Sequence, residues 1–82
     1  MFLARVYVTF KPTVNDPQGL AIRGGLHHLG FGSVDSVRMG KYLEVRLEEA
    51  DAESARARVD QMCRQLLANP VIEEYRFDLE PA

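Results

Sequence analysis

The chain has 82 residues, of which 46% are apolar, with a formal net charge of −2 and a single cysteine. This length predicts one domain over residues 1–82, and the interleaved charges offer no basic field for nucleic acid and no polybasic segment for a membrane surface. One cysteine excludes an internal disulfide and a cysteine-based metal site, and no apolar run approaches the about 20 residues of a membrane span. We therefore expect a small cytoplasmic domain that gains stability from self-association.

The first predicted element is a strand over residues 2–11, in which the side chains alternate between two faces. Ala4, Val6 and Val8 fall on one face, whereas Arg5 and Tyr7 fall on the other. The segment has neither a long apolar core nor a small-residue cleavage site, which argues against a signal peptide. A half-buried strand is therefore expected at the start of the chain.

The first helix is predicted to begin within "NDPQG", residues 15–19. Asn15 and Asp16 can each accept a backbone N–H at a helix start, and Pro17 suits the first helical turn. Gly30 provides a left-handed stop at the other end. Helical spacing places four residues on one inward stripe, which are Ile22, Gly25, Leu26 and Leu29.

Two adjacent glycines interrupt this predicted helix. A glycine in a helix interior costs about 1 kcal/mol relative to alanine, so the pair indicates that something comes close to the helix. We expect Gly25, on the inward stripe, to let the helix settle close to a sheet. Gly24 lies on the outward face with Leu20 and His27, where it would let a neighbouring subunit approach Leu20 and Arg23.

A β-hairpin is predicted over "VDSVRMGKYLEVRLEE", residues 34–49, with Gly40 and Lys41 at or near its bend. A second helix is predicted to begin near Asp51 and to end at Asn69 and Pro70. Its inward stripe would contain Ala55, Val59, Met62, Cys63 and Leu66. Four acidic residues cluster at the start of this helix: Glu48, Glu49, Asp51 and Glu53. We expect them to cap the helix and face solvent rather than to bind a metal or act in acid–base catalysis, because carboxylates are favourable near a helix N-terminus.

The last predicted strand covers "VIEEYRFDL", residues 71–79, which completes the order β-α-β-β-α-β. This order predicts the α+β class and a ferredoxin-like two-layer sandwich, with a four-stranded antiparallel sheet and both helices on one face. The other face would then be uncovered, either solvated or covered by a partner. Its residues would include Leu3, Arg5, Tyr7, Thr9, Tyr42, Glu44, Arg46 and Arg76.

No catalytic, cofactor-binding or metal-binding residue is predicted. Cys63 lies on the apolar stripe of the second helix, so we expect a buried, inert thiol. His27 and His28 point about 100° apart on a helix and cannot form the i, i+4 pair that binds zinc. The stretch "GGLHHLGFG" straddles a helix end instead of leading from a strand into a helix, and it matches no nucleotide-binding fingerprint.

Four ordered motifs, "VYVTFKP", "DPQG", "VRMGKYLEV" and "LLANPVIEEYRF", resemble the PurS family, the small subunit of multi-subunit phosphoribosylformylglycinamidine (FGAM) synthase. The resemblance implies a role in purine biosynthesis, in an ATP-dependent carbon–nitrogen ligase that uses glutamine as amide donor. It implies that a glutaminase subunit (PurQ) releases ammonia and that a synthetase subunit (PurL), which binds ATP and Mg, adds it to the substrate. The PurS-like chain would bridge the two, help to retain the ammonia and carry no cofactor.

With this function we predict a homodimer or higher homo-oligomer and a set of contact residues. A ferredoxin-like regulatory domain that senses a small molecule is the alternative, and a stand-alone hydrolase is a third option. A ligand at 100 times its dissociation constant would stabilise a sensor by about 2.7 kcal/mol, whereas a bridging subunit should respond to proteins. The predicted partner or oligomer contacts are Tyr7, Asp16, Gln18, Leu20, Arg23, Gly24, His27, Arg38, Gly40, Lys41 and Tyr42.

Overall fold

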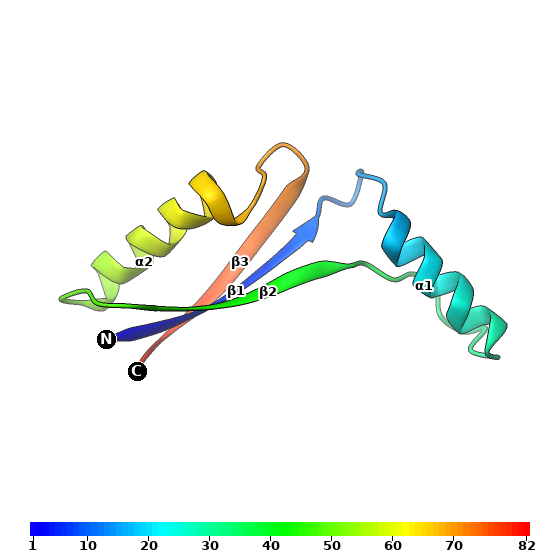
Figure 1. Ribbon diagram of the computed structural model, residues 1–82, viewed down its shortest axis with the longest axis horizontal. Coiled ribbons are helices and arrows are strands. Elements are labelled where there is room, and N and C mark those ends of the chain that lie inside the picture. Colours follow the sequence, from blue (N-terminus) through cyan, green and yellow to red (C-terminus); the bar gives the residue numbers. More distant parts are fainter.

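The computed structural model describes all 82 residues, which form a three-stranded antiparallel sheet and two α-helices (Figure 1). The order along the chain is β1 (Phe2–Phe10), α1 (Pro17–His28), β2 (Gly40–Leu47), α2 (Ala52–Met62), a π-helical turn η1 (Cys63–Leu67) and β3 (Glu73–Pro81). The strands lie in the order β2-β1-β3, so the first strand is central. The predicted α+β class is confirmed.

The predicted fourth strand is absent, and with it the predicted hairpin. Residues 34–39 lie beyond the sheet, and Gly40 and Lys41 begin β2 instead of forming a bend. Hydrogen bonds with side chains of α1 and its cap explain this difference. The carbonyls of Val34 and Asp35 accept from α1 side chains, and the Met39 N–H donates to the Asp16 carboxylate, so these groups make no ladder bonds.

The core lies between the central strand and α2. Ala4, Val6 and Val8 of β1 are at most 1% exposed, as their predicted alternation requires. Val59 of α2 and Cys63 of η1 are fully buried against them. This second helix packs over β1 and β3. Apolar burial of this kind contributes roughly 25 cal/mol for each Å² removed from water, so this half of the molecule holds most of the hydrophobic stabilisation.

The second helix begins as predicted and ends in an unexpected way. Asp51 caps it, because its Oδ1 accepts the Ser54 N–H at 2.8 Å. The chain then changes to π-helical hydrogen bonding from residue 63 to residue 67, which alters the angular position of the residues that follow. Leu66 is therefore 82% exposed, contrary to the prediction, and Leu67 packs against the core in its place. The last strand begins at Glu73, two residues later than predicted.

The prediction that both helices cover one sheet face is wrong, because α1 extends away from the sheet (Figure 1). The molecule measures 51 × 26 × 14 Å, and its radius of gyration is 16.1 Å, whereas a compact chain of this length would have about 12 Å. Gly25 consequently has no neighbouring atom within 4 Å of the position a Cβ would take, so it makes no close approach to the sheet. No helix is both long and apolar enough to cross the bilayer.

Candidate functional site

The start of α1 is fixed by a buried carboxylate that joins two distant parts of the chain. Asp16 is only 3% exposed. Its Oδ1 accepts the Gly19 N–H at 2.9 Å, as expected of a helix cap, and its Oδ2 accepts the Met39 N–H at 2.7 Å. These two backbone N–H groups, Gly19 first, lower the pKa of the Asp16 carboxyl, since both stabilise its charged form. One side chain therefore holds both the helix start and the residue before β2.

Arg38 ties the same region to the end of β1. Its guanidinium donates to the carbonyls of Phe10 at 2.9 Å, Lys11 at 2.6 Å and Val14 at 3.4 Å. The structure thus brings together two residues that the sequence placed in one contact set, Asp16 and Arg38. We call the group formed by Asp16, Gly19, Arg38 and Met39 the corner. It sets the direction in which α1 leaves the sheet.

Gly19 is one of two glycines that a close contact requires, and the other is Gly40 at the start of β2. A Cβ on Gly19 would lie 2.3 Å from the Val37 carbonyl oxygen and 2.6 Å from Asp16 Oδ2. Sequence reasoning assigned the close approach to Gly24 and Gly25, yet at neither does any atom lie within 4 Å of the place that a Cβ would occupy. The sequence did contain a signal for Gly19. This glycine lies three residues after the helix cap Asp16, at the position whose backbone N–H donates to the capping side chain.

Two hollows flank the corner and collect most of the predicted contact residues. One, of about 290 Å³, lies between α1 and residues 35–38, and the predicted residues in its lining are Asp16, Leu20, Arg23 and Arg38. The other, of about 180 Å³, lies where α1 and β2 begin, and the predicted residues in its lining are Gln18, Gly40 and Lys41. Seven predicted residues from separate parts of the sequence are therefore brought to the corner.

Two predicted contact residues on α1 bind the chain's own backbone. Arg23 Nε donates to the Asp35 carbonyl at 2.7 Å, and His27 Nε2 lies 2.7 Å from the Val34 carbonyl oxygen. These bonds hold residues 34 and 35 along one side of α1. Leu20 and Gly24 remain exposed on this helix, and the predicted contact of all four residues with a partner stays a prediction.

The open face of the sheet carries the remaining two predicted residues. The rings of Tyr7 and Tyr42 pair across β1 and β2 with centroids 5.2 Å apart. The Arg76 guanidinium lies 4.0 Å above the Tyr7 ring, which is a favourable cation–π arrangement. Tyr42 donates its hydroxyl to Glu44 at 2.8 Å, and this hydrogen bond raises the pKa of Tyr42. The face is therefore an ordered surface of rings and charges.

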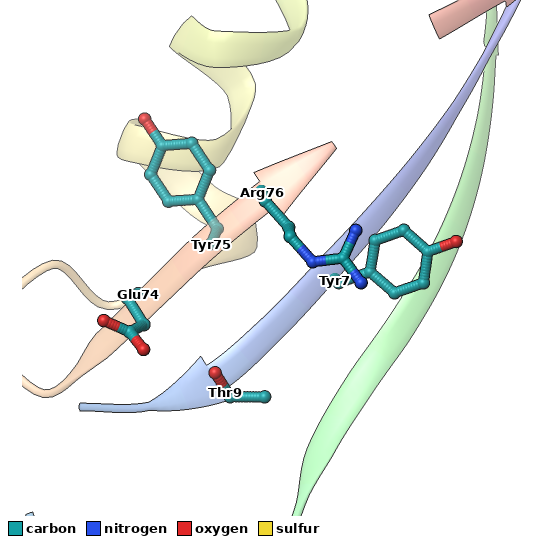
Figure 2. A pocket seen from close by; sticks show the side chains of 5 residues that line it. All are labelled: Tyr7, Thr9, Glu74, Tyr75 and Arg76. Atoms are coloured by element: carbon teal, nitrogen blue, oxygen red, sulfur yellow. The ribbon is translucent and has the colours of Figure 1, made fainter. Parts of the chain in front are cut away.

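A hollow of about 430 Å³ opens on this side of the molecule, between β1 and β3 (Figure 2). Figure 2 shows Arg76 reaching across to Tyr7, while Tyr75 turns to the opposite side, toward α2. The Tyr75 hydroxyl donates to Asp60 at 2.6 Å, which raises the pKa of Tyr75 and joins β3 to α2. The Tyr7 ring and the Arg76 guanidinium that line this hollow belong to residue types that are enriched at protein interfaces.

Cys63 is buried, as predicted. Its side chain is fully enclosed between η1 and the sheet, and the thiol is free. Burial first, and the nearby Asp60 carboxylate second, raise the pKa of the Cys63 thiol, so it stays protonated at neutral pH. A protonated thiol is a weak nucleophile, and Cys63 acts as a small apolar residue of the core.

Comparison with known proteins connects this geometry to one family. The profile of PurS, described as phosphoribosylformylglycinamidine (FGAM) synthase, matches residues 3–81. The PurS subunit of Synechocystis is 51% identical over 75 residues, covering 92% of this chain and 75% of that protein. The PurS subunit of Bacillus subtilis is 44% identical over 80 residues, covering 98% of this chain and 94% of that protein.

Solved structures agree with the sequence matches. A structure of Bacillus subtilis PurS superimposes with a TM-score of 0.88 at 43% identity, covering 99% of this chain and 100% of that chain. A chain in a structure of PurLQS from Thermotoga maritima has a TM-score of 0.86 at 30% identity, covering 98% of this chain and 99% of that chain. The protein therefore belongs to the PurS family of FGAM synthase subunits.

Proposed function

We propose that this chain is the accessory subunit that bridges the glutaminase (PurQ) and synthetase (PurL) subunits of FGAM synthase. The observation that carries this proposal is the near full-length match to a chain of the PurLQS structure from Thermotoga maritima. In this role the chain performs no chemistry of its own. It holds two active sites in register, so that ammonia released at one reaches the other within a single assembly.

The proposal assigns the cofactors to the partner. ATP and Mg²⁺ bind the synthetase subunit, which activates the substrate amide, and this chain binds neither. The work takes place in the cytoplasm, as part of purine biosynthesis. Complementary surfaces suffice for the bridging role, which needs no nucleophile and no general base. The buried, protonated thiol of Cys63 agrees with a structural role for the single cysteine.

Two surfaces are proposed to make the bridging contacts. The first is the corner with its two hollows, where polar groups and the exposed Leu20 side chain lie together. The second is the open sheet face around Tyr7 and Tyr42, where Arg76 holds the Tyr7 ring in place. Aromatic rings and arginines are enriched at protein interfaces, which supports the second surface.

Self-association is part of the same proposal. The chain exposes 5739 Å², whereas a compact monomer of 9.3 kDa exposes about 5000 Å². Only 9 of its 82 residues are buried. A chain with so little buried surface gains stability when a second copy covers its apolar groups, and we propose a homo-oligomer.

The proposed function is tested by reconstitution with the glutaminase and synthetase subunits of the same organism. Synthesis of the amidine product is measured with glutamine and, separately, with ammonium salt, each with and without this chain. We expect omission to abolish the glutamine-dependent reaction and to leave the ammonia-dependent reaction in place. Equal glutamine-dependent rates with and without the chain would overturn the proposal.

A further inference from the structure

The hollow on the open face of the sheet contains two opposite charges that do not pair with each other. Glu74 and Arg76 both line it, two residues apart on β3 and therefore on the same face of the strand. Glu74 takes no part in the ion pairs of the chain, and Arg76 approaches only Asp78, at 4.0 Å, with both side chains largely exposed. Both charged groups therefore keep hydrogen-bonding positions available to a ligand.

The Tyr7 ring holds Arg76 away from Glu74. The register of β1 and β3 places Tyr7 directly opposite Arg76, and Thr9 directly opposite Glu74. The Arg76 guanidinium lies 4.0 Å from the centre of the Tyr7 ring, and cation–π attraction favours this position. Figure 2 shows the Arg76 side chain extending toward Tyr7 and away from Glu74, with Thr9 on the neighbouring strand. The guanidinium and the carboxylate are thus held apart, and both line the same hollow.

The chemistry of this hollow favours a ligand that carries one negative and one positive group. A guanidinium binds a carboxylate through two parallel N–H donors, and a carboxylate accepts hydrogen bonds from an ammonium group. Glu74 would repel a ligand with a negative charge alone, and Arg76 would repel one with a positive charge alone. The volume of the hollow, about 430 Å³, lies within the roughly 300–1,000 Å³ of small-molecule sites.

We infer that this hollow binds a free α-amino acid in its zwitterionic form. The ligand carboxylate pairs with the Arg76 guanidinium, which the Tyr7 ring orients, and the ligand ammonium donates to the Glu74 carboxylate. The Thr9 hydroxyl, which can both donate and accept, lies on the same face beside Glu74. Both charges of an α-amino acid are attached to one carbon atom, so a single small molecule can contact two side chains that are two residues apart on a strand.

This site goes beyond the bridging role, because it gives the chain a small-molecule ligand of its own. The ligand would lie next to Tyr7, on the sheet face that we propose as the second bridging surface. Recognition requires only the side chains of one chain, so binding is expected without the glutaminase and synthetase subunits. The site can therefore be tested on the isolated protein, separately from the bridging function.

The first test is an NMR titration of the ¹⁵N-labelled chain at neutral pH with each of the common L-α-amino acids. We expect at least one of them to cause saturable shifts of the backbone amide signals of Thr9, Glu74 and Arg76, while the signal of Ala57 on α2 stays in place. The N-acetyl derivative of the best ligand lacks the ammonium charge, and its amide lacks the carboxylate. Each analogue should bind roughly 10-fold more weakly or worse, because a hydrogen bond between charged groups is lost.

Three variants then assign the two charges to their side chains. Glu74→Gln and Arg76→Gln each remove one charge, and each should raise the dissociation constant of the best ligand roughly 10-fold or more. The matched control is Arg46→Gln, which removes a positive charge from the same face of the sheet outside the hollow and should bind like the parent. The unshifted amide signals of each variant report whether its fold is kept.

Two results would overturn the inference. One is the absence of saturable shifts at these three amides with every amino acid, as expected if the hollow receives only charged side chains of another protein. The other is equal binding by the free amino acid and its two analogues, or by the parent and the Glu74→Gln and Arg76→Gln variants. Neither result bears on the reconstitution assay, which still tests bridging by itself.

Discussion

The two ends of this molecule are stabilised in different ways. At one end, the sheet and α2 enclose apolar side chains, with Val6 and Val59 fully buried. At the other end, the buried residues are Asp16 and Gly19, and polar bonds to the backbone hold α1 in place. The difference teaches that one half folds by hydrophobic burial, whereas the other is positioned by hydrogen bonds and leaves apolar side chains of α1 exposed.

The largest expected effect comes from placing a charge in the apolar half. Val59→Asp would bury an unpaired carboxylate and should lower the free energy of unfolding by roughly 3–5 kcal/mol. Ala57→Asp, on the exposed side of the same helix, should cost no more than about 0.7 kcal/mol. Urea unfolding followed by circular dichroism measures both. Similar losses in the two variants would contradict the assignment of the core to this half.

The second effect tests the tight contact at the corner. Gly19→Ala would place a Cβ 2.3 Å from the Val37 carbonyl, and relieving this clash should cost about 1–3 kcal/mol of unfolding free energy. Thermal unfolding at neutral pH is the measurement. A variant as stable as the parent would show that the corner is loose and that α1 is not held by it.

Gly24→Ala should have an effect of opposite sign and smaller size. No atom lies within 4 Å of the added Cβ, and alanine favours a helix by about 1 kcal/mol over glycine. We expect a higher melting temperature for the variant in isolation. Its behaviour in the reconstitution assay then reports on the predicted contact, because lost assembly with a more stable fold would place a partner against Gly24.

A pH-dependent effect is expected from Asp16→Asn, whose amide keeps one hydrogen-bond acceptor and places an NH₂ donor where the carboxylate accepts a second backbone N–H. The pKa of Asp16 is lowered on folding, so its contribution to stability is complete above the unfolded value of 3.8, shrinks as the pH falls below it and is gone below the folded value. Unfolding measured from pH 7 to pH 2 should show a weaker acid dependence in the variant. Parallel curves would contradict an ionised Asp16 at the corner.

The three observed strands and the two helix starts could be predicted from local sequence because their signals are local, whereas the predicted fourth strand was wrong. Alternation in β1, the Asp16 cap with Pro17 and the Asp51 cap each depend on residues a few positions apart, and the structure confirms all three. Burial of Cys63 followed from its helical spacing in the same way. The eleven contact residues were chosen partly by resemblance to a family, and seven of them do gather at the corner.

What local pattern could not decide is where each element goes. The apolar stripe of α1 predicts that the helix packs on the sheet, yet in the structure Ile22 and Leu29 on this stripe are exposed and the helix lies away from the sheet. Hydrogen bonds from Asp16 and Arg38 to backbone groups more than 20 residues away settle this point, because they direct residues 34–39 away from the sheet. The sequence by itself determined β1, the two helix starts and the inward face of β1, because those signals are local, while long-range polar contacts determined how the elements are arranged.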